Sequence, residues 1–196
     1  MAIRLEQMHP TLVHLPIALL PLAVMADWLG AVRDDDALRE VGRTAIGVAA
    51  AGAVAAAGTG LIAGEEVNEG GARDMLMTHR NLNAAVTVTA LGMAAWRARS
   101  ERPGALYLAT GAAAVGLLGY TAYLGGRLVY AHGVAVKPAG GVYRPGAPTM
   151  RVGQLRSFFA AALVDLFHGV RHMVSEVSNG NVVPWLTNSR RLSLPE

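Results

Sequence analysis

The chain of 196 residues contains no cysteine. Disulfide bonds, thiolate-held iron–sulfur clusters and covalent haem attachment through a C-x-x-C-H motif are therefore excluded. Sites built from histidine and carboxylate side chains stay open, and so does haem that is bound without a covalent link.

Charged residues are also scarce, at 16% of the chain, whereas soluble domains usually contain about 25%. The deficit is concentrated in four blocks without Asp, Glu, Lys or Arg, namely 10–26, 44–64, 81–96 and 103–126. A spanning helix needs roughly 20 apolar residues. We therefore predict an all-α integral membrane four-helix bundle, with helices over about 10–29, 38–63, 78–97 and 104–130. A soluble all-α bundle is the alternative. The first apolar run lacks a strongly basic leader and a small-residue cleavage site, so we expect it to be a retained helix.

Aromatic residues make up only 6% of the chain, and no basic stripe is interleaved with stacking aromatics. The net charge of +3 comes from loops and from the C-terminal region, so we do not expect nucleic-acid binding. The second and fourth blocks are rich in Gly and Ala instead. Small residues let helices approach closely in lipid, which predicts tight packing there.

The chain beyond the fourth helix divides by composition. We predict a four-helix transmembrane domain over 1–136, a Gly/Pro-rich linker over 137–150, an amphipathic helix over 151–178 and an irregular tail over 179–196. Asp165 and Arg171 fall inside the third segment and argue against a fifth span. We expect this C-terminal amphipathic helix to lie on the membrane or to dock on a partner.

The histidines are the residues of this sequence that most favour a functional site. In an up-and-down bundle of four spans, one membrane face receives the start of the first helix, the end of the second, the start of the third and the end of the fourth. That face carries four histidines and two arginines, namely His9, His14, His79, His132, Arg80 and Arg127. Ionisable groups at membrane depth are costly, so their grouping favours a functional site. The opposing interpretation is that each is an ordinary interfacial polar residue.

A haem b group needs axial imidazoles, small residues around the ring and cations for its propionates. We predict His14 and His79 as the axial pair, with His132 able to replace either one, and we give His9 less weight because it precedes the helix. Arg80 and Arg127 would pair with the propionates.

Another metal is the second option, because His9, His14, His79, His132, Glu65 and Glu66 include zinc and copper ligands. We interpret His168 and His172, four residues apart, as a solvated polar face, since the pair lacks the glutamate of an H-E-x-x-H motif. Asp27 either belongs to a proton path or pairs with a nearby loop arginine.

The distribution of arginine predicts how the protein is oriented in the membrane. The face opposite the histidines has two short loops that contain Arg33, Arg39, Arg43, Arg97, Arg99 and Arg102. The positive-inside rule makes that face cytoplasmic if Arg127, Lys137 and Arg144 on the histidine face are discounted. We therefore expect a multi-pass protein of the bacterial inner membrane with its histidines on the periplasmic side.

Two segments resemble the signatures of a known family. The residues HPTLVHLPIALL at 9–20 are similar to its opening signature H-P-x-x-V-H-F-P-I-A, and YTAYLGGRLVYAHG at 120–133 is similar to its closing signature Y-T-G-x-L-G-G-x-L-V-Y-x-H-G. Leu15 stands where Phe is usual, and Ala122 where Gly is usual. The family comprises small bacterial four-span membrane proteins with a domain of unknown function. The resemblance covers about 8–136 and implies a four-helix membrane domain, a bacterial source and a candidate for b-type haem binding.

The sequence thus favours a small cytochrome-like membrane subunit that binds haem b for electron transfer within a membrane complex. Its expected partners are the lipid bilayer and other membrane subunits, a cytochrome among the candidates. The alternative is a cofactor-free structural or assembly subunit. Either role is non-catalytic. A transporter is disfavoured because the spans carry almost no charge beyond Asp27.

Overall fold

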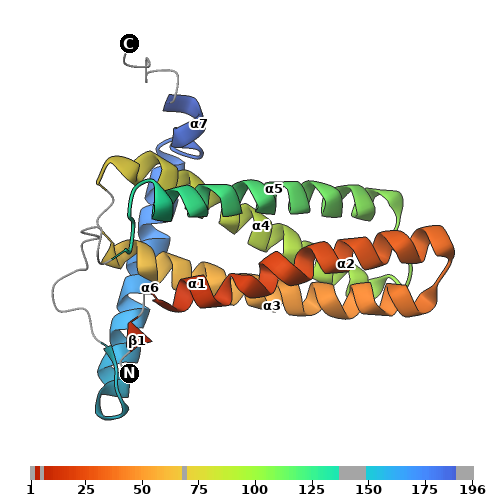
Figure 1. Ribbon diagram of the computed structural model, residues 1–196, viewed down its shortest axis with the longest axis horizontal. Helices are drawn as coiled ribbons and strands as arrows, with labels where there is room; N and C mark the ends of the chain where they lie inside the picture. Colours follow the sequence, from red (N-terminus) through yellow and green to blue (C-terminus); the bar gives the residue numbers. More distant parts are fainter. Residues whose placement is uncertain (1–2, 5–6, 68–69, 137–148, 189–196) are drawn as a thin grey trace. The chain divides into compact units, whose positions relative to one another are not determined.

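The computed structural model describes residues 3–4, 7–67, 70–136 and 149–188. Its elements in chain order are β1 Ile3–Arg4, α1 Met8–Leu12, α2 His14–Arg33, α3 Asp36–Glu66, η2 Gly70–Ala72, α4 Arg73–Arg99, α5 Ala105–Tyr130, β2 Thr149–Met150, η4 Val152–Gln154, α6 Leu155–Ser178 and α7 Pro184–Asn188 (Figure 1). The strands form one two-residue antiparallel pair, with Ile3 opposite Met150. The predicted all-α fold class is confirmed.

Three segments within the described residues are long and apolar enough to cross a membrane: Met8–Arg33, Asp36–Glu66 and Ala105–Tyr130. The helix α4 matches them in length, with 27 residues, but its first turns carry Arg73, Asp74, Arg80, Asn81 and Asn83. Length and apolarity therefore support three of the four predicted spans, and α4 is the more polar member of the set.

The first predicted helix is divided into α1 and α2 at Val13. Pro16 explains the division, because it has no N–H to donate to the carbonyl of Leu12, four residues earlier. The backbone N–H of Ile17 then bonds to the Val13 carbonyl at 3.2 Å and continues the helix.

A tight turn joins α2 to α3. Asp34 adopts a left-handed conformation with φ 53°, and its N–H bonds to the carbonyl of Gly30. Asp35 then caps α3, since its Oδ1 accepts hydrogen bonds from the backbone N–H groups of Ala37 and Leu38 at 2.9 and 3.1 Å. The two aspartates therefore end one helix and begin the next.

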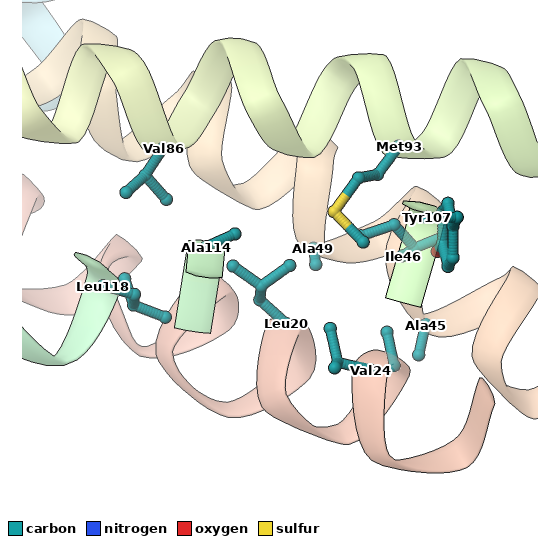
Figure 2. Close-up of a cluster of buried hydrophobic side chains, with 11 residues drawn as sticks. Leu20, Val24, Ala45, Ile46, Ala49, Val86, Met93, Tyr107, Ala114 and Leu118 are labelled. Carbon is teal, nitrogen blue, oxygen red and sulfur yellow. The ribbon is translucent and has the colours of Figure 1, made fainter. Parts of the chain in front are cut away.

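The described chain forms two compact units, which we call the bundle unit, 10–57 and 83–120, and the histidine unit, 1–9, 58–82 and 121–196. The core of the bundle unit draws side chains from four helices: Leu20 and Val24 of α2, Ala45, Ile46 and Ala49 of α3, Val86 and Met93 of α4, and Tyr107, Ala114 and Leu118 of α5 (Figure 2). At Gly111 of α5 a Cβ atom would come within 2.8 Å of Val24, so a small residue permits this close packing.

The histidine unit contains the end of α3, the beginning of α4, the end of α5 and both C-terminal helices. Phe158 of α6 is buried against Ile62 of α3, with Met8, Met150, Ala162 and Leu166 packed around them. The predicted linker lies largely outside the described residues, which omit 137–148. The predicted amphipathic segment contains α6, and the segment that the sequence predicts to be irregular contains the short helix α7.

Candidate functional site

Two histidines meet in the histidine unit. His9 lies in α1 and His79 in the second turn of α4, and both are half-buried. Their ring centroids are 6.5 Å apart, and the ring planes are nearly perpendicular, at 85°. We call this pair, with the residues that hold it, the histidine site.

The carbonyl of Thr121 in α5 fixes the protonation pattern of His79. Its oxygen lies 2.9 Å from His79 Nδ1. A carbonyl oxygen can only accept, so Nδ1 carries the proton, and the neutral ring has its lone pair on Nε2. Histidines that ligate metals are oriented in this way, with the second ring nitrogen donating to a carbonyl or carboxylate.

Each histidine ring rests against a glycine. A Cβ atom on Gly60 of α3 would lie 3.0 Å from Cε1 and Nδ1 of His9. A Cβ atom on Gly125 of α5 would lie 3.0 Å from Cε1 of His79. By contrast, a Cβ atom on the neighbouring Gly126 would meet nothing within 4 Å. Gly60 and Gly125 therefore leave the space that the two imidazole rings occupy.

The structure distributes the other predicted site residues differently. His14 is exposed, belongs to the bundle unit and has Nδ1 3.2 Å from the carbonyl of Thr11. The predicted pairing of His14 with His79 joins residues of different units and stays a prediction. His132 is exposed just beyond the end of α5.

The two predicted arginines are half-buried members of the histidine unit. The guanidinium of Arg127 lies 5.6 Å from the ring centroid of Trp185 in α7, a cation–π contact. Arg80 follows His79 directly, and its Nε donates to Asn81 Oδ1 at 3.3 Å.

Sequence reasoning missed the part of this unit that comes from the C-terminal segment. The backbone N–H of Trp185 donates to Thr78 Oγ1 at 2.9 Å, next to His79 in the chain. The amide of Asn81 donates to the carbonyls of Asn181 and Val182 at 3.2 and 2.8 Å. The polar residues at the start of α4 were the only sign of these contacts in the sequence. Their partners lie about a hundred residues later in the chain, so the sequence pattern does not reveal them.

Within the described residues, the structure adds no ligands to the zinc or copper site that the sequence offered as the second option. Among the described residues, no three His, Cys, Asp or Glu side chains are grouped so that they could hold a metal ion. Glu65 Oε1 instead lies 2.8 Å from His172 Nδ1 in α6. His172 also stacks on His168, with ring centroids 6.4 Å apart.

A second polar cluster is buried in the bundle unit. Arg97 Nη2 lies 3.0 Å from Asp27 Oδ1, and both side chains are at most 1% exposed. Arg97 also donates to the carbonyls of Arg39, Ser100 and Glu101 at 2.6–2.8 Å. Asp27 therefore has the arginine partner that the sequence suggested, and Arg97 links α2, α3, α4 and the loop that follows α4.

Comparison with known proteins now gives a family. A family model described as "Predicted membrane protein (DUF2231)" matches residues 6–138, more than half of the chain. The chain belongs to this family. The match bears out the resemblance seen in the sequence, and it identifies a membrane protein with helical transmembrane segments. No curated protein and no solved structure shows a significant match.

The boundaries of the DUF2231 match separate two parts of the histidine unit. His9, Gly60, His79, Thr121 and Gly125 lie within the matched residues. The helices α6 and α7 lie beyond them. This DUF2231 protein therefore places its histidine site inside the family domain and packs further helices against that domain.

Proposed function

We propose that this DUF2231 protein is a small membrane cytochrome that binds haem b between His9 and His79 and transfers electrons within a membrane complex. The observation that carries the proposal is the pair of nearly perpendicular imidazole rings, 6.5 Å apart, in one compact unit of a membrane protein. His9 and His79 would each hold the haem iron through one ring nitrogen.

The number of ligands favours haem over a bare metal ion. Zinc sites use three or four protein ligands, whereas haem iron takes four nitrogens from the porphyrin and needs one or two from the protein. The histidine site supplies two imidazoles, and no larger His/Asp/Glu group occurs in the described residues. Haem would supply an iron that exchanges one electron.

The surrounding residues fit this role. The contact with Thr121 favours the tautomer of His79 whose lone pair is on Nε2, the nitrogen that would ligate the iron. Gly60 and Gly125 keep side-chain bulk away from both rings. Arg80 and Arg127 belong to the same unit, and we assign them to the propionates because a guanidinium pairs with a carboxylate through two hydrogen bonds.

Four matched histidine variants test the assignment. The full chain is expressed with haem supply, and reduced-minus-oxidised absorption spectra are recorded on purified protein. We expect His79→Ala and His9→Ala each to abolish the low-spin b-type spectrum, and His132→Ala to leave it intact. His14→Ala decides between the pair in the histidine site and the pair that the sequence favours. Loss of the spectrum in His14→Ala but not in His9→Ala would refute the structural assignment.

A cofactor-free structural or assembly subunit is the second candidate. Large apolar side chains on α2 and α6 are exposed, among them Met25, Val32, Leu163 and Phe167. Such surfaces suit packing against lipid or against other membrane subunits. Colourless protein that does not bind added haemin and that purifies in fixed stoichiometry with partner subunits would establish this role instead.

A further inference from the structure

The helix α6 has an apolar stripe that no described residue covers. Side chains spaced three or four residues apart are 40–67% exposed along it: Phe159, Leu163, Phe167, Val170, Val174 and Val177. We call these six residues the α6 stripe. Its neighbours Leu155 and Val164 are also exposed.

The opposite side of α6 is polar, and the face between the two is packed. Phe158, Asp165 and Gly169 are buried. At about 100° per residue, these three residues form one face, with the α6 stripe on one side of it. The residues on its other side are mostly polar, namely Ser157, His168, His172 and Ser175, and Ala161 and Val164 lie among them. The stripe and the polar face therefore point in roughly opposite directions, each at a large angle to the packed face.

The packed face fixes α6 to the end of an apolar helix. A Cβ atom on Gly169 would lie 2.8 Å from the carbonyl oxygen of Leu61 in α3, and His172 contacts Glu65. The charge-free run of α3 ends at Gly64, and Glu65 and Glu66 follow. The point where a spanning helix changes from apolar to charged residues marks the membrane boundary. The middle of α6 is held at that level.

The charges that α6 exposes are basic. Arg156 and Arg171 of α6 are exposed, and so is Arg151 shortly before the helix. By contrast, Asp165 is buried and Glu176 pairs with Arg73 at 2.7 Å. A basic helix with one apolar face is typical of segments that lie in the interface of a membrane with anionic headgroups.

We infer that α6 lies in the plane of the membrane on the side of the histidine site. Its stripe enters the acyl chains of that leaflet, its polar face meets water, and its arginines lie among anionic phospholipid headgroups. The occupant of the stripe is therefore lipid. Because α6 lies outside the matched family domain, this chain adds an in-plane anchor to the four long helices. The inference needs no cofactor and is independent of the haem proposal.

Site-directed spin labelling tests the inference on the full chain. Because the chain has no cysteine, Leu163→Cys labels the stripe alone and Ser175→Cys labels the polar face alone. Both positions are exposed, so neither change disturbs the packing. The labelled proteins are reconstituted into vesicles of phosphatidylcholine and phosphatidylglycerol, and collision rates are measured with oxygen, which concentrates in lipid, and with a water-soluble nickel complex.

We expect the label at 163 to collide preferentially with oxygen and the label at 175 with the nickel complex. In vesicles of phosphatidylcholine alone, we expect the label at 163 to lie at a shallower depth. In the double variant with Arg156→Gln and Arg171→Gln, we expect the depth of the label to be the same in both kinds of vesicle. Preferential collision of label 163 with nickel would place the stripe in water and overturn the inference. Low collision rates with both reagents at 163 would show that protein covers the stripe, and spin–spin broadening there would identify a second copy. Unchanged depth in neutral vesicles would refute the role of the arginines.

Discussion

Gly125 leaves the space beside the ring of His79, so we expect it not to tolerate a larger residue. In a helix interior, Gly→Ala ordinarily stabilises by roughly 0.5–1 kcal/mol. Here the added methyl would meet Cε1 of His79 at 3.0 Å, and the Thr121 carbonyl holds that ring in place. We expect Gly125→Ala to destabilise the protein by about 1–3 kcal/mol, the usual cost of overpacking.

The neighbouring glycine provides the control for this prediction. Gly126 precedes Arg127 on the same helix, and a Cβ atom there meets nothing within 4 Å. Gly126→Ala should therefore be neutral or stabilising in denaturation experiments in mild detergent. Equal effects of the two substitutions would mean that the contact with His79 does not constrain α5.

The sequence could predict which histidines and arginines lie at one end of the bundle, but it could not predict how the histidine rings are placed. The types of residue on one face follow from the order of the spans, and they include His9, His79 and Arg127. The preference for His14 over His9 rested on its place inside the predicted helix. The structure adds what the sequence did not predict, because the short helix α1 begins at Met8 and places His9 beside Gly60. The contact with Thr121 is equally invisible in the sequence, since it uses a backbone carbonyl.

The buried pair Asp27–Arg97 acts at the element scale, because it joins α2 to α4. Removal of one partner leaves a buried charge without its counter-ion, which typically costs 3–5 kcal/mol. We expect Asp27→Asn and Arg97→Met each to destabilise by about this amount, and the double variant to lose clearly less than the sum. Thermal unfolding of the four proteins of the cycle measures the coupling.

An exposed arginine serves as the control for the pair. Arg99 lies two residues further along α4 and is exposed, so Arg99→Gln should change stability by less than ~0.5 kcal/mol. Additive effects of the Asp27 and Arg97 substitutions would contradict a direct interaction between the two side chains.

The turn between α2 and α3 has its own pH dependence. The hydrogen bond from Arg39, followed by the charges of Arg102 and Arg39, lowers the pKa of Asp34 below its ordinary value of 3.8. The charged carboxylate is therefore favoured in the folded state. Its contribution to stability is complete above pH 3.8 and is lost as the pH falls through the lowered pKa.

Carbon-detected NMR titration of Asp34 measures this shift directly. We expect a midpoint below 3.8, and a higher midpoint in Arg102→Gln, because Arg102 Nη1 lies 3.4 Å from Asp34 Oδ1. A midpoint at or above the ordinary value would contradict the ion pairs of this turn.

Helix α4 shows where element prediction from the sequence was strong and where it was incomplete. Its charge-free run was recognisable, and its Val86 and Met93 indeed pack in the core of the bundle unit. Its polar beginning extends about a turn and a half earlier than predicted, to Arg73. Those polar residues bond to α6, to α7 and to the segment between them, through Arg73, Asp74, Thr78 and Asn81. A periodic pattern cannot reveal such contacts between distant segments.

Orientation in the membrane is a property of the whole molecule. By the positive-inside rule, we expect the two short loops with the arginines at 33, 39, 43, 97, 99 and 102 in or beside them to lie in the cytoplasm. We expect a single cysteine in place of Ser100 to resist an impermeant maleimide in intact cells, and one in place of Ala131 to react. The reverse pattern would mean that the protein has the opposite orientation, and reaction of both in intact cells would contradict a membrane-spanning α5.

The central claim is that two perpendicular imidazoles hold a haem in a small membrane protein. The most direct test is low-temperature electron paramagnetic resonance of the purified full chain with one equivalent of ferric haem. If His9 and His79 held the iron with their ring planes at 85°, the protein would give a highly anisotropic low-spin signal. We expect His79→Ala and His9→Ala each to abolish this signal. A high-spin signal of free haemin, or a low-spin signal that survives both substitutions, would contradict the account.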